Sequence, residues 1–384
     1  QKNPGNPNNA DLLIWVNLQQ KNFYGAFIQA RAIDRRYKLG GLRLMDIGSI
    51  ALENKDYSNA IKIFSYVVDQ YGGTQNYQIA RRMVIKAREE MVKNTYPVAY
   101  DEISILITDY RALVDEIGIN HYTAEALRSM ALLYAFYLDD RTEAIKILEQ
   151  IISYPRMNKS IVDLSKLDLG DIYLLAGEPW ESTLLYSQVE KSSKETPIGY
   201  EAKLKNAKLS YFKGEFQLAQ EHLDVLKIAT TREIANDAMQ LSLFIKDNTI
   251  IEDSEEAMQR YANIEQILFQ NRKTEALDSL EKLAKDYPNH SITDDVYMLQ
   301  AKINQELGNF EKSLALLEKI TIDFADDILY DDAMYLMGKI HEENMGDKAK
   351  AMEIYQDFLI KHPGSIYTAE VRKRFRILRG DILN

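Results

Sequence analysis

The sequence repeats a pattern every 37 residues near its C-terminal end. Ile264, Ala301 and Gly338 occupy the same position in three successive copies. Each copy holds two segments with helical apolar periodicity, joined by a short turn. Because one helical hairpin of this size cannot bury its apolar face alone, successive copies must stack. The period therefore predicts a helical solenoid that offers one extended binding surface.

Weaker copies of the pattern cover much of the remaining chain. They open at Gly48, Ala131, Gly170 and Ala207, and only the stretch 77–113, with its turn at Tyr96-Pro97, keeps the register poorly. The last of these copies and the one at Ile264 are 57 residues apart. That gap leaves room for an additional helix over 233–246 and a polar connector over 247–253, where we expect the main internal break.

The residue types follow from how two helices approach each other. A small residue on the first helix of a pair, such as Gly338, permits close packing. The aromatic residue or leucine on the second helix, such as Tyr355, is expected to fill the gap toward the next repeat. Asp294-Asp295 and Asp331-Asp332 stand in predicted first turns, where each carboxylate should stabilise a helix by ~0.3–1 kcal/mol.

Composition narrows the class of protein. The chain has 384 residues, 46% of them apolar, which is enough for a packed interior. It contains no cysteine, so we expect neither a disulfide framework nor a thiolate metal site. No apolar run reaches the ~18 residues of a membrane-spanning helix. Residues 1–10 are polar and lack the apolar segment of a signal peptide, although a signal or anchor could have been removed upstream.

Charge is distributed unevenly. Residues 1–100 hold 14 Lys and Arg against 8 Asp and Glu, whereas the remaining 284 hold 33 against 50. The net charge of −11 predicts that nucleic acid is not a partner, because its phosphates would be repelled. The basic end remains compatible with an acidic protein or a membrane surface.

The repeated positions resemble the tetratricopeptide repeat. That family has a small residue at the eighth position, Ala at the twentieth, an aromatic residue or Leu at the twenty-fourth and Pro near the thirty-second. The resemblance covers most of residues 10–380 and is strongest over 254–384. It implies an all-α fold, a right-handed superhelical solenoid of antiparallel helix pairs. It further implies that partners bind in a concave groove lined by the first helices.

On this basis we expect three regions. Residues 1–10 form a disordered polar N-terminus, residues 11–247 an N-terminal array of such repeats, and residues 254–384 a C-terminal array. The basic run 371–379 is interpreted as a capping helix with a polar outer face. A docking patch for an acidic partner is the alternative interpretation of the same run.

Two departures from the ordinary repeat indicate a subfamily. The units are longer than 34 residues, and the loops 287–291 and 362–365 resemble junctions in envelope versions of the family. Those versions include the outer-membrane assembly lipoprotein of the barrel-insertion machinery and the periplasmic coordinator of the Tol–Pal system. The resemblance implies a periplasmic or outer-membrane-associated protein of a Gram-negative cell, with membrane association possible through a removed N-terminal anchor. A cytoplasmic location is the alternative.

The sequence contains no recognisable catalytic or metal-binding motif. Its five histidines are scattered, and His341-Glu342-Glu343 lacks the spacing of metal ligands, so we interpret it as surface. A nucleophile elbow, a phosphate-binding loop and a dinucleotide fingerprint are all missing. We therefore predict no catalytic residue, no metal and no cofactor.

Candidate binding residues follow from the family resemblance. Its groove positions on first helices combine aromatic, Met and charged side chains, which suits a protein or peptide segment better than a compact metabolite. Packing between helices is the alternative for the tyrosines. The candidate groove residues are Met45, Arg128, Lys208, Tyr211, Tyr261, Met298, Lys302, Tyr335 and Lys339, and further mapped positions are Leu132, Glu265 and Gln305.

Three functions remain open from the sequence. The first is a non-enzymatic scaffold of the bacterial cell envelope that binds a partner protein or peptide in its groove. The second is a glycan-binding nutrient-uptake lipoprotein, which would require exposed tryptophans. We interpret Trp15 as core of the first helix pair, and Trp180 as a staple of its turn rather than a sugar platform. The third is an enzyme on a helical solenoid, for which the sequence reveals no polar pocket.

Overall fold

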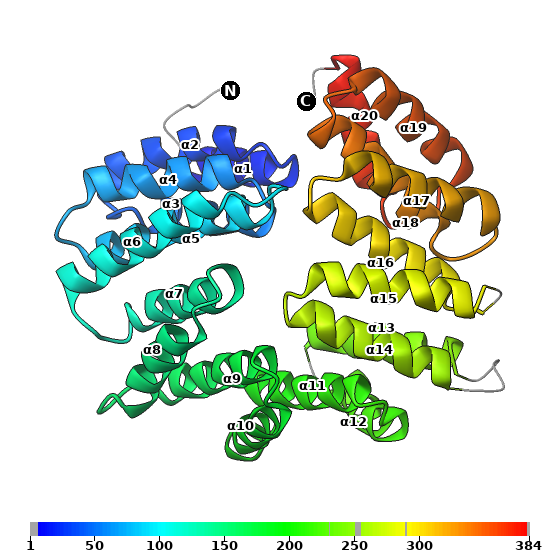
Figure 1. The fold of residues 1–384 in the computed structure, drawn as a ribbon. Coiled ribbons are helices and arrows are strands. Elements are labelled where there is room, and N and C mark those ends of the chain that lie inside the picture. Colours follow the sequence, from blue (N-terminus) through cyan, green and yellow to red (C-terminus); the bar gives the residue numbers. More distant parts are fainter. Residues whose placement is uncertain (1–6, 230, 250–254, 289, 382–384) are drawn as a thin grey trace. The chain divides into compact units, whose positions relative to one another are not determined.

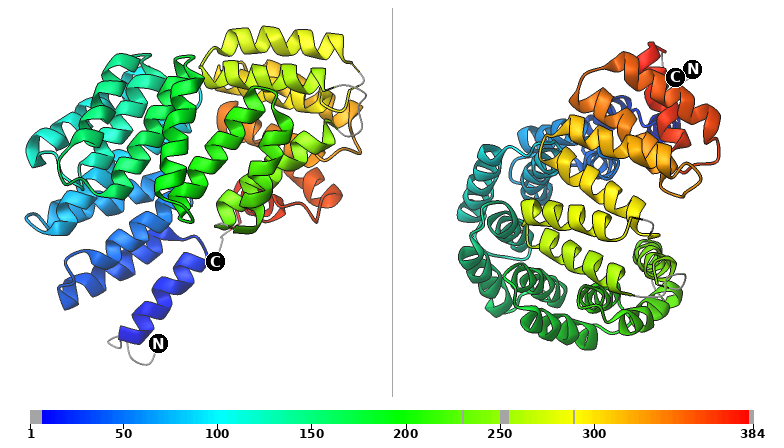
Figure 2. Two further views of the ribbon diagram at one scale, coloured as in Figure 1. Left: turned by 90° about the horizontal axis from the view of Figure 1, so that it is seen from below. Right: turned by 45° about the vertical axis from the view of Figure 1, so that its right-hand side comes forward.

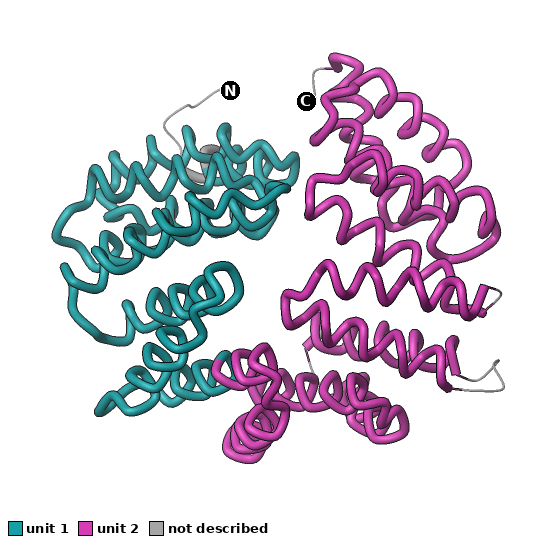
Figure 3. Tube along the Cα trace, in the orientation of Figure 1, with its two compact units in different colours: residues 1–168 teal, residues 169–384 magenta. Residues whose placement is uncertain are grey.

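All regular structure in the described part of the chain is helical. The computed structural model describes residues 7–229, 231–249, 255–288 and 290–381, apart from the side chains of residues 7–10, 229 and 232. Most consecutive helices pack against each other, in antiparallel order (Figure 1; Figure 2). The expected all-α fold of antiparallel helix pairs is confirmed. The chain divides into two compact units, residues 1–168 and 169–384 (Figure 3).

The first unit is a stack of helical hairpins. Its largest core joins the first five helices around residues such as Phe23, Leu44 and Phe64. The helices are α1 (Pro7–Gln19), α2 (Phe23–Tyr37), α3 (Leu42–Glu53), α4 (Tyr57–Gln70), α5 (Gln75–Lys93), α6 (Tyr100–Ile117), α7 (Ala124–Tyr137), α8 (Arg141–Ser153) and the first part of α9 (Lys159–Leu175).

The second unit continues the hairpins and adds one unpaired helix. One core extends from Leu204 to Ile303 and includes Ala238 and Ile245 of that helix, α13. The helices after α9 are α10 (Pro179–Ser192), α11 (Pro197–Phe212), α12 (Phe216–Ala229), α13 (Arg232–Asp247), α14 (Glu256–Phe269), α15 (Lys273–Asp286), α16 (Thr293–Glu306), α17 (Phe310–Asp323), α18 (Tyr330–Lys339) with the π-helical turn η1 (Ile340–Asn344), α19 (Lys348–Lys361) and α20 (Thr368–Arg379).

Eight of the described helix pairs share one turn. In each, a residue with a left-handed backbone directly precedes the N-cap residue of the second helix. This turn is missing from the α5–α6 pair, where the sequence pattern also keeps its register poorly. The carboxylate that follows often caps the new helix: Asp56 accepts from the Asn59 amide (3.1 Å), and Asp347 from the Lys350 amide (3.0 Å). The left-handed residues are Lys21, Lys55, Asp139, Gly177, Gly214, Asn271, Gly308 and Gly346.

Glycines on three first helices lie under aromatic rings. A Cβ added to Gly48, Gly170 or Gly338 would lie within about 3.0 Å of carbons of a ring on the second helix of the same pair. The rings are those of Phe64, Tyr186 and Tyr355. Each ring therefore contacts the first helix of its own pair. The expectation that these aromatics also fill the gap toward the next repeat stays a prediction.

Several expected boundaries differ from the observed ones. Of residues 1–10, expected to be disordered, 1–6 lie outside the described residues and 7–10 form the first turn of α1. Trp15 is not in the core as expected but 58% exposed, because the neighbouring Ile14 and Leu18 are the residues of α1 that turn toward the core. The expected division at 247–254 stays a prediction, since 250–254 lie outside the described residues. The core of the second unit includes residues from both sides of that segment.

Candidate functional site

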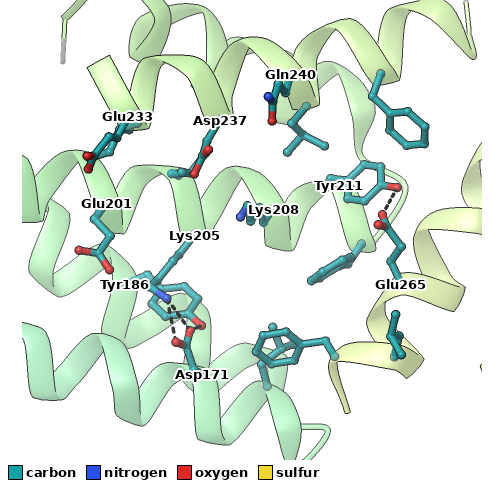
Figure 4. A pocket seen from close by; sticks show the side chains of 18 of the residues that line it. Asp171, Tyr186, Glu201, Lys205, Lys208, Tyr211, Glu233, Asp237, Gln240 and Glu265 are labelled. Carbon is teal, nitrogen blue, oxygen red and sulfur yellow. Dashed lines mark hydrogen bonds and ion pairs between the residues drawn. The ribbon is translucent and has the colours of Figure 1, made fainter. Parts of the chain in front are cut away.

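The second unit contains a cavity of about 1370 Å³ (Figure 4). Four first helices of pairs, α9, α11, α14 and α16, contribute to its lining, together with the unpaired helix α13. The side chain of Gln270, just after α14, donates to the carbonyl of Leu174 in α9 (3.3 Å). This bond holds the C-terminal ends of two first helices together at the cavity, although 96 residues separate them in the sequence.

Helix α13 forms one wall because of its periodicity. Glu233, Asp237, Gln240 and Phe244 recur at helical spacing and all line the cavity. Figure 4 shows the first three on the helix that faces α11. The opposite side of α13 is fixed to α12, where Gln220 donates to the carbonyl of Ser242 (2.9 Å). The additional helix expected over 233–246 is thus present and contributes a wall of the site.

One end of the cavity is acidic. Asp171 of α9 accepts two bonds from the Lys205 ammonium (2.7 and 3.0 Å) and one from the Tyr186 hydroxyl (2.7 Å). Glu201, Glu233 and Asp237 lie on α11 and α13 at the same end (Figure 4). Four carboxylates therefore share this end with the ammonium of Lys205, and Lys208 lies between this end and the aromatic one (Figure 4).

The other end is aromatic. The Phe244 ring lies 5.3 Å from that of Tyr261 and 6.4 Å from that of Tyr211, between centroids. The Tyr211 hydroxyl donates to Glu265 of α14 (2.5 Å). Phe212, Leu241, Leu268 and Phe269 complete this part of the lining. Such a wall offers apolar surface with few polar groups, as ligand sites generally do.

Two carboxyl groups near the aromatic end have raised pKa values. Burial raises the pKa of Glu265, while the Tyr211 hydroxyl and the nearby cations of Lys208 and Lys302 counteract the rise. Burial, aided by the charge of Asp294, raises the pKa of Asp295 to about 8. Lys208 and Lys302 are exposed, and neither forms an ion pair within the described residues. Their cations instead offset the charge of Glu265.

The structure brings together four of the nine predicted groove residues. Lys208, Tyr211, Tyr261 and Lys302 all line the cavity, as does Glu265 from the wider set. Binding through these residues stays a prediction. The residues of α13 were not predicted as part of the site. The 57-residue spacing between the repeats at Ala207 and Ile264 was the signal that could have indicated them. A helix inserted between groove helices must cover part of the groove.

The other predicted residues lie elsewhere. Met45 and Met298 are buried in separate hydrophobic cores. Arg128 forms an ion pair with Asp168, with its Nε 2.5 Å from the carboxylate.

The last two residues lie at the end of the second unit. The Tyr335 ring stacks on Tyr367, with centroids 4.3 Å apart. The Lys339 ammonium lies over the Tyr335 ring and 3.8 Å from Glu343. Both side chains therefore already have partners within their own unit.

Three features of the described residues bear on other kinds of site. No group of three or more His, Cys, Asp or Glu residues is placed to hold a metal ion. None of the helices is both long enough and apolar enough to span a bilayer. Trp180 is 77% exposed, with the Lys213 ammonium 4.7 Å from its ring centre.

The sequence contains two segments, 253–290 and 332–365, that match the family model of the tetratricopeptide repeat. The chain contains tetratricopeptide repeats. The first segment includes α14 and α15, and the second includes η1 and α19. Arrays of such repeats generally act as scaffolds for protein–protein interaction.

The solved structures to which the chain is similar are distant from it. A tetratricopeptide repeat protein from Parabacteroides merdae is 10% identical, with a TM-score of 0.36 over 89% of this chain and 99% of that one. The apo form of the quorum sensor NprR from B. thuringiensis is 13% identical, with a TM-score of 0.41 over 82% and 86%. The P58(IPK) tetratricopeptide domain is 14% identical, with a TM-score of 0.26 over 97% of both chains. No curated protein matches the sequence.

Proposed function

We propose that this protein is a non-enzymatic scaffold that binds a segment of a partner protein in the cavity lined by α9, α11, α13, α14 and α16. The observation that carries the proposal is the cavity itself, about 1370 Å³ in volume, with aromatic and charged side chains on four first helices and α13. The resemblance to the repeat family implies a groove lined by first helices, and four of them line this cavity.

The lining favours a peptide over a compact metabolite. Its polar groups are spread along several helices rather than converging on one point, and its aromatic groups form a separate wall. Side chains of a peptide can reach such separated sites at once, with a few aromatic contacts supplying most of the affinity.

A displayed library of random 12-residue peptides, selected on the full chain, tests the proposal. We expect enriched peptides to bind with fluorescence anisotropy changes that saturate, and to lose binding at least tenfold in Gln240→Trp, which fills the cavity from α13. Leu243→Trp, on the same helix but outside the lining, is the matched control and should bind normally. Equal binding by both variants would remove the cavity from the proposal.

We also propose a location in the bacterial cell envelope. The support is the resemblance of the loops 287–291 and 362–365 to junctions in envelope versions of the repeat. Fractionation of cells that express the natural gene should place the protein in the periplasmic or membrane fraction. Recovery with the cytoplasmic proteins alone would contradict this part.

Glycan binding remains the second candidate because one observation favours it. Trp15 and Trp180 are both exposed, and an exposed Trp ring can stack on a sugar. A glycan array probed with the full chain separates the two functions, since a scaffold for peptides should bind none of its sugars. Binding that is lost in Trp180→Ala would favour the glycan function.

A further inference from the structure

We infer that the cavity selects segments carrying a Lys or Arg side chain at one end and an aromatic or large aliphatic side chain at the other. This inference rests on the proposed function, since it names the kind of peptide that the same cavity takes.

The acidic end attracts a cation because its carboxylates outnumber its ammonium groups. Glu201 on α11 and Glu233 and Asp237 on α13 lie at this end together with the Asp171–Lys205 pair (Figure 4). Glu233 and Asp237 are exposed and form no ion pair in the described part of the chain. A guanidinium or ammonium group placed among these carboxylates would offset their mutual repulsion and gain charge-assisted hydrogen bonds.

The aromatic end does not compete for that cation. Glu265 lies among Tyr211, Tyr261 and Phe244, and its charge is opposed by Lys208 and Lys302. Apart from Asp295, the remaining surface here is mainly apolar, formed by side chains such as Leu241 and Phe269. A large apolar side chain gains most by entering this end, because burial of its surface against these rings is favourable.

The distance between the two ends sets the spacing of the ligand side chains. Glu233 and Phe244 are eleven residues apart on α13, which corresponds to about 16 Å at the rise of an α-helix. An extended segment covers that distance in about five residues. The preferred pattern is therefore a basic residue and an aromatic or large aliphatic residue about five positions apart.

The sequences of peptides selected on the full chain test this inference. We expect Lys or Arg to be enriched about five positions from Phe, Tyr, Trp or Leu. Affinity of such a peptide should fall at least tenfold in the double variant Glu233→Lys/Asp237→Lys. The double variant Asp247→Lys/Glu318→Lys changes the net charge equally at exposed positions outside the lining, and should bind as the unaltered chain does.

The outcomes separate this inference from the proposed function. Peptides that depend on the cavity, by the Gln240→Trp comparison, but carry no basic residue would overturn the inference and leave the function standing. Enrichment of acidic peptides, recognised by Lys208 and Lys302, would have the same effect. Absence of any cavity-dependent peptide would overturn both. Circular dichroism of each variant confirms that a loss of binding is not a loss of fold.

Discussion

Gly338 and Tyr355 illustrate how single residues set the distance between paired helices. The ring of Tyr355 occupies the space that a side chain at position 338 would need, and its hydroxyl donates to Glu342 (2.7 Å). That carboxylate also binds Arg374 of the last helix (2.8 Å). The ring is therefore fixed through its hydroxyl by a chain of polar contacts, and it cannot move aside without disturbing them.

Replacing Gly338 with Ala should destabilise the protein. Overpacking of a core contact costs about 1–3 kcal/mol, and the better helix propensity of Ala offsets only about 1 kcal/mol of this. We expect a lower midpoint in chemical denaturation. Gly364→Ala is the control, because its Cβ would meet nothing within 4 Å, and it should leave the midpoint unchanged. A Gly338→Ala variant as stable as the unaltered chain would contradict the packing described here.

At Asp295, tertiary structure outweighs the local stabilisation that a carboxylate gains in the first turn of a helix. Its position in the first turn of α16 predicts stabilisation by the helix dipole. Burial of the Asp295 carboxyl group instead disfavours its charged form and raises its pKa. The charges of Asp294, Glu265 and Asp327 raise this pKa further, while a hydrogen bond with Asn248 lowers it. The sequence could predict where the helix starts. It could not predict the environment of Asp295, because the residues that create this environment lie on α14, directly after α13 and after α17.

The free energy of unfolding should depend on pH through Asp295. Its pKa is about 8 in the folded protein and 3.8 as a reference, so folding favours the protonated form. The stability that this group contributes is fully present below pH 3.8 and declines as the pH rises toward 8. In Asp295→Asn, which cannot ionise, the decline should be smaller.

Thermal melts of the two proteins across this range check the prediction. The melting temperature of Asp295→Asn should match that of the unaltered chain near pH 4 and exceed it near pH 9. Asp326→Asn changes an exposed carboxylate in the same unit and serves as the control. A constant difference at all pH values would show that ionisation of Asp295 does not matter for stability.

At the level of helices, the turns within pairs explain what periodicity could and could not predict. Gly308 and Gly346 marked their turns in the sequence, since glycine adopts a left-handed backbone without strain. Lys21 and Lys55 adopt the same conformation. Lysine carries no sequence signal for it, so those turns followed only from the spacing of the flanking helices.

The candidate site was predictable only in part for a related reason. Applied to this sequence, the groove positions of the family correctly indicated four residues that line the cavity. The apolar periodicity predicted that the α13 segment is a helix. That α13 contributes a wall could not be predicted, because it depends on contacts such as the one between Gln220 and Ser242 across two helices. Arg128 was misleading because Asp168, its partner, is distant in the sequence.

Phe244→Ala should loosen α13 more than any neighbouring helix. The substitution removes the ring that lies between Tyr211 and Tyr261. Removal of a fully buried aromatic side chain costs about 3–5 kcal/mol of stability. Because Phe244 is only half-buried, we expect a smaller loss of stability. Hydrogen exchange of the amides of α13 should accelerate. Leu243→Ala, at a 52% exposed position on the same helix, should leave exchange unchanged. Equal effects of the two substitutions would contradict the anchoring role of Phe244.

At the scale of the whole chain, packing is mainly between neighbours in sequence. Most helices contact chiefly the one before and the one after, as α4 contacts α3 and α5, whereas α14 contacts α11 and α15. Stability in such arrays is close to a sum of repeat and interface contributions. Damage should therefore remain local.

Phe64→Ala tests this locality. The ring is fully buried against α3, and its removal should cost about 3–5 kcal/mol in that part of the first unit. Hydrogen exchange should accelerate over α2 to α5 and change little over α16 to α19. Uniform acceleration along the chain would mean that the repeats unfold as one cooperative body. Tyr66→Ala, at a partly exposed position on the same helix, gives the comparison for a smaller loss of packing.

Helix α13 joins the array between two complete hairpins and is not itself a member of one. The residues that it presents to the cavity differ from those with which it is fixed to α12, so the two sets can change independently. A designer could exchange Glu233, Asp237 and Gln240 for other side chains and retune what the protein captures, while every tetratricopeptide repeat keeps its own sequence.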